Sequence, residues 1–130
     1  MKFRLASVAV LAGLLVPALP VLAHHSFAAE YDSSKPIEIK GTVTRVDWTN
    51  PHARFYVDAK DKDGKVVNWN FELASPNVLI RNGWTRKALQ VGDEVTVQGS
   101  QAKDASNLAN ARSIVLANGK RVFAGQVDTN

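Results

Sequence analysis

The sequence contains no cysteine, and its only methionine is Met1. Disulfide bonds, thiolate metal sites and Cys-x-x-Cys redox chemistry are therefore excluded, and the fold must be held together by core packing. Histidine is scarce as well, with only His24, His25 and His52. Apart from the thioether of Met1, any bound metal would have to use imidazole, amine or carboxylate groups.

Two further features are missing, a long basic run and an apolar segment long enough to cross a membrane. The 130 residues carry 16 basic and 12 acidic side chains, for a net charge of +4. That balance gives little electrostatic support for a nucleic-acid partner. The apolar run of residues 5–16 is shorter than the ~20 residues of a membrane-spanning helix. We therefore expect no nucleic-acid partner and no stable membrane span.

The first 23 residues are typical of a secretory signal peptide. A short basic head, Met1–Arg4, precedes the apolar run, and Val21–Ala23 places small or apolar residues before the expected cleavage point. Cleavage after Ala23 would give a periplasmic or secreted protein that begins at His24. An uncleaved amino-terminal anchor is the alternative, and it fits the proline-containing end of this segment less well.

The rest of the chain alternates apolar and polar residues over short stretches, which is typical of half-buried strands. Residues 37–43 alternate strictly, and the apolar phase then reverses, which predicts a bulge near Thr44 and Arg45. Asp61–Gly64 is a hairpin signal between two further alternating runs, and Ser75-Pro76 is a helix start. Further strands are expected at residues 94–99, 110–116 and 121–123.

These elements predict an all-β protein, a small five- to six-stranded OB-like barrel with one short helix after the third strand. Closure of a barrel removes exposed strand edges. The predicted organisation is a signal peptide at residues 1–23, an extended arm at 24–36, the barrel domain at 37–123 and a flexible tail at 124–130.

Four motifs together resemble a family of exported bacterial proteins classed as a domain of unknown function. They are His24-His25-Ser26-Phe27-Ala28-Ala29-Glu30-Tyr31-Asp32, Gly41-x-Val43-x-x-Val46-x-Trp48-x-Asn50-Pro51-His52, Glu72-x-x-Ser75-Pro76 and Gly92-Asp93. The resemblance covers residues 24–123 and implies an exported small β-barrel. It implies no particular activity.

Cleavage after Ala23 would put a free amine and an imidazole on one residue, His24. This ligand set is similar to that of copper proteins with a histidine brace, although the similarity does not extend to fold or sequence. His52 or His25 would supply the third nitrogen. Copper(II) favours such nitrogen donors, and zinc is a less constrained alternative.

Glu30, Asp32 and Asn50 are predicted to orient imidazole N–H groups around this metal. The competing interpretation is that His52 has a purely structural role as a hydrogen-bonding residue of a turn.

A second hypothesis involves no metal. Trp48, Tyr56 and Trp84 could form a stacking surface for a polysaccharide, a small molecule or another protein of the cell envelope. The expected function is thus an exported, non-enzymatic binding protein, with copper as the possible cofactor and a metal-free OB-like interaction module as the alternative. A copper oxygenase is a third hypothesis, disfavoured because so short a chain offers little platform for a polymeric substrate.

Overall fold

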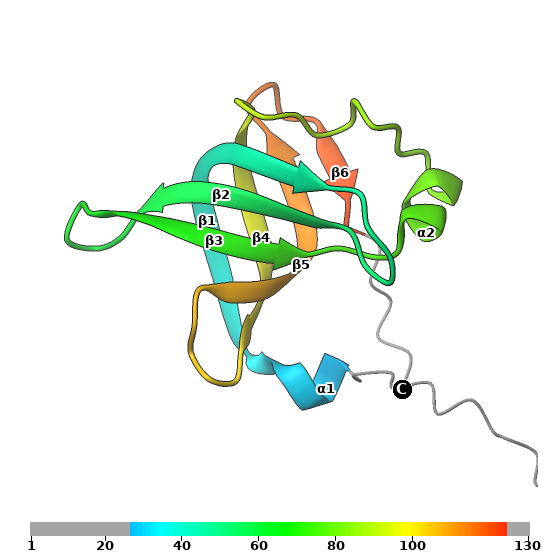
Figure 1. The fold of residues 1–130 in the computed structure, drawn as a ribbon. Helices are drawn as coiled ribbons and strands as arrows, with labels where there is room; N and C mark the ends of the chain where they lie inside the picture. Colours follow the sequence, from blue (N-terminus) through cyan, green and yellow to red (C-terminus); the bar gives the residue numbers. More distant parts are fainter. Residues whose placement is uncertain (1–26, 125–130) are drawn as a thin grey trace, which may run out of the picture.

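A computed structural model describes residues 27–124, in which six strands and two short helices follow one another (Figure 1). The elements are α1 (Phe27–Glu30), β1 (Tyr31–Asp47), β2 (Arg54–Lys60), β3 (Val66–Glu72), α2 (Pro76–Arg81), β4 (Glu94–Ala102), β5 (Leu108–Leu116) and β6 (Arg121–Phe123). The strand order is β3-β2-β1-β4-β5-β6, and a parallel pairing between β3 and β5 closes the sheet. The predicted all-β, OB-like barrel with a short helix after the third strand is confirmed.

The long strand β1 belongs to both halves of the barrel. Its stretch Pro36–Thr42 pairs with β4, and its stretch Gly41–Asp47 pairs with β2. The register with β2 shifts between Val43 and Arg45, which confirms the predicted bulge. Figure 1 shows β1 curling over as it passes from one partner to the other. The bulge and the curl allow this one strand to pair with β4 along its first part and with β2 along its last part.

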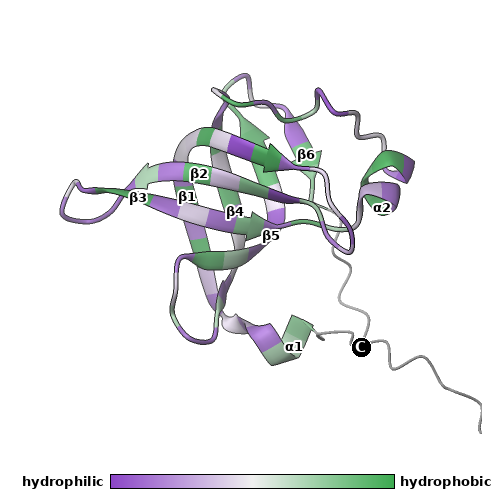
Figure 2. Cartoon of the chain, in the orientation of Figure 1, coloured by the Kyte–Doolittle hydropathy of each residue, from purple (hydrophilic) through white to green (hydrophobic). Residues whose placement is uncertain are grey.

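Strands β2 and β3 form the predicted hairpin. Their faces alternate between the core and the outside, as the bands of hydropathy along both strands show in Figure 2. Phe55 and Phe71 pair across the two strands with ring centroids 5.1 Å apart, and both are fully buried. Val57 and Trp69 continue the same face. This inward face fixes the register, so the outward residues of the two strands also lie opposite one another.

Helix α2 follows β3 through a short linker. Ser75 caps it by accepting a hydrogen bond from the backbone N–H of Val78, and Pro76 occupies the first turn, as the sequence predicts. The linker is fixed by two backbone hydrogen bonds to Ala53: Ala53 N–H donates to the carbonyl of Ala74 at 3.0 Å, and Leu73 N–H donates to the carbonyl of Ala53 at 2.9 Å. The loop between β1 and β2 therefore lies against the end of β3. Within residues 27–124, no helix has the length and hydropathy of a membrane span.

The amino-terminal arm differs in form from the extended segment expected for residues 24–36. Residues 27–30 make one helical turn, and β1 already begins at Tyr31. Tyr31 pairs with Ala102 on β4 before the register shifts to Pro36 and Ser100. Residues 31–36 of the predicted arm therefore belong to strand β1 of the barrel. The predicted signal peptide at residues 1–23 and nearly all of the predicted tail, residues 125–130, lie outside the described residues.

Gly41 should be intolerant of a side chain. A Cβ atom at this position would collide with the backbone carbonyl of Asp58 on β2, which cannot move without breaking the strand pairing. We expect Gly41→Ala to lower the free energy of unfolding by about 1–3 kcal/mol, the usual cost of overpacking. Urea unfolding measures this change, and an unchanged m-value would show that the unfolded state is unaffected.

Thr42→Ala is the matched control, because Thr42 is the next residue of the same strand and is exposed. Its effect should stay near the ~0.5 kcal/mol typical of surface positions. Equal effects of the two substitutions would contradict the close approach of β1 and β2 at Gly41.

Candidate functional site

A buried carboxylate at the end of β3 is the centre of a polar cluster that joins three segments of the described chain. Glu72 is only 4% exposed, although the alternation of β3 places it on the outward face. Its two oxygens contact three side chains from three different segments, through hydrogen bonds from Arg54 and Tyr31 and an ion-pair contact with His52. A carboxylate removed from water in this way is stable only when such donors replace its hydration.

The first donor is His52, in the loop between β1 and β2. Its Nδ1 atom lies 2.7 Å from Oε1 of Glu72, and its side chain is 38% exposed. The Asn50–Pro51 peptide bond of this loop is cis. The Thr49 hydroxyl donates to the carbonyl of His52 at 3.3 Å, which links the two ends of the turn. The ring is therefore held at one edge by a buried charge and reaches solvent elsewhere.

The second donor is Arg54, the first residue of β2. It stands opposite Glu72 in the hairpin register, and its Nη2 donates to Oε2 at 2.7 Å. Its Nη1 also donates to the side-chain carbonyl of Asn70, at 3.3 Å. The guanidinium supplies the positive charge that a buried carboxylate requires, and charge-assisted hydrogen bonds of this kind are the strong ones.

The third donor is Tyr31, where the arm joins the barrel. Its hydroxyl donates to Oε2 of Glu72 at 2.7 Å, and its ring lies 5.6 Å from that of Phe27 in α1. The side chain is buried. Burial, and then the adjoining Glu72 carboxylate, raise the pKa of the Tyr31 hydroxyl far above its ordinary value of 10.0. Tyr31 therefore stays protonated and keeps the start of β1 fixed to Glu72.

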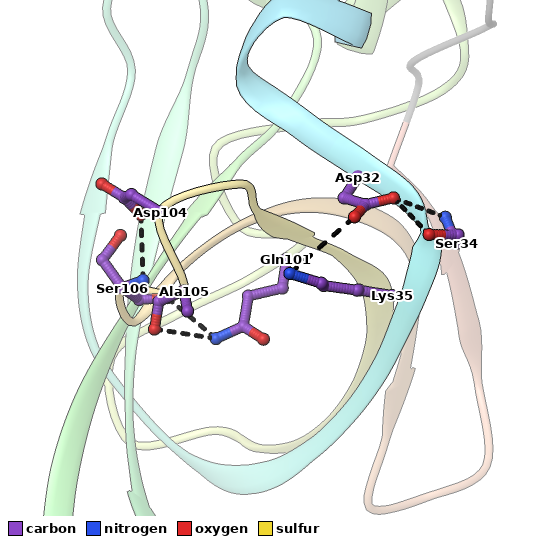
Figure 3. A network of polar contacts seen from close by, with 7 residues as sticks. All are labelled: Asp32, Ser34, Lys35, Gln101, Asp104, Ala105 and Ser106. Atoms are coloured by element: carbon purple, nitrogen blue, oxygen red, sulfur yellow. Dashed lines mark hydrogen bonds and ion pairs between the residues drawn. The ribbon is translucent and has the colours of Figure 1, made fainter.

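The loop between β4 and β5 supports the same end of the barrel. Lys103 N–H donates to the carbonyl of Glu30 at 3.0 Å, which joins this loop to α1. Asp32 accepts from the backbone N–H and the hydroxyl of Ser34, and these hydrogen bonds lower the pKa of its carboxyl group (Figure 3). Figure 3 also shows Gln101 donating to two carbonyls of the same loop. The arm is thus anchored on two sides.

Of the three predicted metal ligands, the structure describes only His52. His52 is held in the cluster, whereas His24 and His25 lie outside the described residues. The carboxylate that contacts the imidazole of His52 is that of Glu72. Of the three residues expected to orient that imidazole, Asp32 is engaged by Ser34, Asn50 is exposed, and Glu30 ends α1.

No group of three or more histidine, aspartate or glutamate side chains that could hold a metal occurs within residues 27–124.

The three aromatic residues predicted to form a ligand surface lie in different settings. Trp84 is 4% exposed, and its indole N–H donates to the carbonyl of Phe123 at 2.6 Å. Trp48 is partly buried against Trp84 in an edge-to-face contact of 6.1 Å. Tyr56, on the outward face of β2, has the guanidinium of Arg45 4.7 Å above its ring. Trp84 is therefore a core residue, and only Trp48 and Tyr56 retain exposed surface.

Glu72, Arg54 and Tyr31 were not identified as site residues from the sequence. Alternation places Glu72 on the outward face of β3, and alternation alone does not reveal what covers that face. A usable signal was present, since the Asp61–Gly64 turn sets Arg54 opposite Glu72. No comparable local signal indicates Tyr31, which is 41 residues away from Glu72 in the sequence.

The raised pKa of Tyr31 predicts a loss of stability in alkali. The hydroxyl ionises in the unfolded chain above pH 10.0 but stays protonated in the folded protein, so its contribution is complete below that pH and falls as the pH rises. The stability advantage of the wild type over Tyr31→Phe should shrink by about 1.4 kcal/mol per pH unit above this value. Denaturant unfolding at about pH 9 and pH 11 measures the change.

Tyr56→Phe is the control for loss of a tyrosine hydroxyl, because Tyr56 contacts Arg45 on the outward face of β2. The change between pH 9 and pH 11 should be larger for Tyr31→Phe than for Tyr56→Phe. A stability difference between the wild type and Tyr31→Phe that does not change with pH would contradict the buried, protonated hydroxyl.

Comparison with known proteins adds a family but no activity. A search of curated proteins found no match, and a search of solved structures found none either. A family profile, described as Family of unknown function (DUF6152), matches residues 11–110. The match covers most of the 130 residues, including β1 to β4 and the whole Glu72 cluster. This chain therefore belongs to the family of unknown function DUF6152.

Proposed function

We propose that this protein is exported and binds a copper ion, without catalysing a reaction, through His52 and the histidines that precede α1. The mature chain would begin at His24 after cleavage behind Ala23, in the periplasm or outside the cell. His24 would contribute its amine and its imidazole, and His25 is the alternative donor on the same segment.

The observation that carries the proposal is the sharing of one carboxylate by His52 and the arm. Nδ1 of His52 and the hydroxyl of Tyr31 each lie 2.7 Å from an oxygen of Glu72. Their side chains are therefore neighbours, although 21 positions separate them in the sequence. The root of the histidine-bearing segment and the third histidine thus belong to one cluster.

Chain length supports the same arrangement. His24 is three residues before Phe27, so its Cα atom is at most about 11 Å from that of Phe27. Phe27 in turn contacts the ring of Tyr31. A donor on His24 or His25 therefore needs no long connection to approach the exposed edge of His52. Two donors on one terminal residue also lower the entropy cost of assembling the site.

Copper suits this ligand set better than zinc does. Imidazole and amine nitrogens rank copper(II) highest among the divalent ions of the first transition row. A terminal amine with a pKa of ~8 loses its proton readily near neutral pH. Zinc sites of four protein ligands usually add thiolates or carboxylates. The chain has no cysteine, and the carboxylate beside His52 is engaged by three donors.

The metal-free alternative receives less support. The ring of Trp48 lies edge-on to Trp84 with Arg86 5.7 Å from its centroid, and Tyr56 is covered by Arg45. Trp84 itself is buried. A continuous aromatic platform for stacking a sugar or a base would need these ring faces to be open.

The proposal is tested on the exported protein with its amino terminus read by intact mass. One equivalent of copper(II) should give an electron paramagnetic resonance signal of a nitrogen-rich centre. His52→Ala and His24→Ala should each weaken binding by at least about 100-fold, because removing a ligand costs more than the 10–100-fold loss seen when an outer partner is removed.

Two comparisons sharpen the result. A form with the amine of His24 acetylated keeps every imidazole but removes the amine as a donor, so it should lose the terminal chelate. His25→Ala decides which histidine of the pair is the donor. Unchanged copper binding in both the acetylated form and His52→Ala would refute the proposal and leave the metal-free module as the better hypothesis.

A further inference from the structure

We infer that Glu72 is a positioning residue, which makes Nε2 the ligating nitrogen of His52 and ties the arm to it through Tyr31; this rests on the proposed metal function. Neither the family nor the sequence motifs assign such a role. One carboxylate determines which ring nitrogen of His52 is available and holds the two donor segments together.

The first step concerns the proton on His52. A carboxylate paired with a guanidinium, as Glu72 is with Arg54 at 2.7 Å, accepts hydrogen bonds. The Nδ1 atom, 2.7 Å from Oε1, must therefore carry the ring proton. In the neutral ring the lone pair then resides on Nε2. Histidine in water prefers the opposite tautomer, with its proton on Nε2, where it would block a metal at that atom.

The two carboxylate oxygens of Glu72 have different partners. Oε1 faces His52, whereas Oε2 accepts from both Arg54 and Tyr31. The carboxylate is thus asymmetric, because Oε2 accepts two hydrogen bonds and Oε1 lies next to the ring of His52. An isosteric amide in place of Glu72 would keep its only oxygen toward the two donors and turn its NH2 group toward His52.

The third step concerns the arm. Tyr31 is the first residue of β1, and the helical turn before it leads back to His25 and His24 in the sequence. Its hydrogen bond to Oε2 places the root of that segment on the same carboxylate that orients His52. Docking of the arm and orientation of His52 are therefore coupled, and by thermodynamic linkage copper must strengthen both.

A purely structural ion pair makes different predictions. Buried salt bridges are weak devices for stability, and a structural role would require only that Glu72 and Arg54 stay paired. Such a role places no demand on the tautomer of His52. The tautomer is therefore the quantity that separates a positioning residue from a structural one.

The deciding experiment needs no metal. Nitrogen-15 resonance of the neutral His52 ring should show the proton on Nδ1 in the wild type, and Glu72→Gln should move it to Nε2 while the fold is retained. A wild-type ring with its proton on Nε2, or a Glu72→Gln ring with its proton still on Nδ1, would overturn the inference. This outcome is independent of whether copper binds.

Copper titration then tests the link to function. Glu72→Gln and Tyr31→Phe should each weaken copper(II) binding about 10–100-fold, the usual effect of removing a partner behind a metal ligand. Tyr56→Phe is the matched control and should bind as the wild type does, because Tyr56 contacts Arg45 on the outward face. Wild-type affinity in Tyr31→Phe would overturn the coupling of the arm to the site.

The two failures can be told apart. A wild type that takes up no copper would refute the proposed function, while its His52 tautomer would still decide the role of Glu72. In the copper-bound wild type, pulsed electron paramagnetic resonance should detect the remote ring nitrogen as one hydrogen-bonded to a carboxylate. Loss of that feature in Glu72→Gln, with the nitrogen-rich centre retained, is the expected spectroscopic signature.

Discussion

The requirement that a buried carboxylate be neutralised organises this end of the molecule. Glu72 is withdrawn from water on the outward face of β3, and each of its donors comes from a different segment. Taking a carboxylate out of water costs several kcal/mol unless donors replace its hydration. The loop before β2, the start of β2 and the start of β1 must therefore converge on it. The local architecture follows from that convergence.

The barrel makes the convergence possible. The parallel pairing of β3 with β5 brings the end of β3 to the junction where the sheet closes, with Glu72 level with Asn110. The long strand β1 begins beside this junction and finishes in the hairpin with β2, so it delivers Tyr31 at one end and the loop of His52 at the other. A shorter first strand would serve only one of these positions.

Much of the fold could be predicted from local sequence signals. The bulge after Val43, the Asp61–Gly64 hairpin and the Ser75 cap depend on neighbouring residues whose chemistry is sufficient to define them. Period-two alternation likewise identified the inward faces of β2 and β3. The boundaries of the arm were less accessible, since the sequence of residues 31–36 gives no sign that β4 is there to pair with Tyr31 and Pro36.

The site was less predictable because burial on an outward face is a tertiary effect. Alternation places Glu72 on the side of β3 that normally meets solvent, but there it is 4% exposed and contacted by Tyr31 of the arm, by Arg54 and by His52. His52 was identified from its rarity and its chemistry, but its partner was sought among neighbours in sequence. The actual partner lies on another strand and is reached through the hairpin register.

The charged cluster around Glu72 is not an efficient source of folding stability. Apolar residues of similar volume often stabilise a protein as well as, or better than, a buried ion pair. The β2–β3 hairpin already has a well-packed inner face around Phe55 and Phe71, so it does not depend on the outward pair for its register. The charged cluster instead orients the imidazole of His52, because Glu72 contacts one ring nitrogen while the side chain stays 38% exposed. Orientation of a single nitrogen donor is the property that a metal ligand needs and that an apolar contact cannot provide.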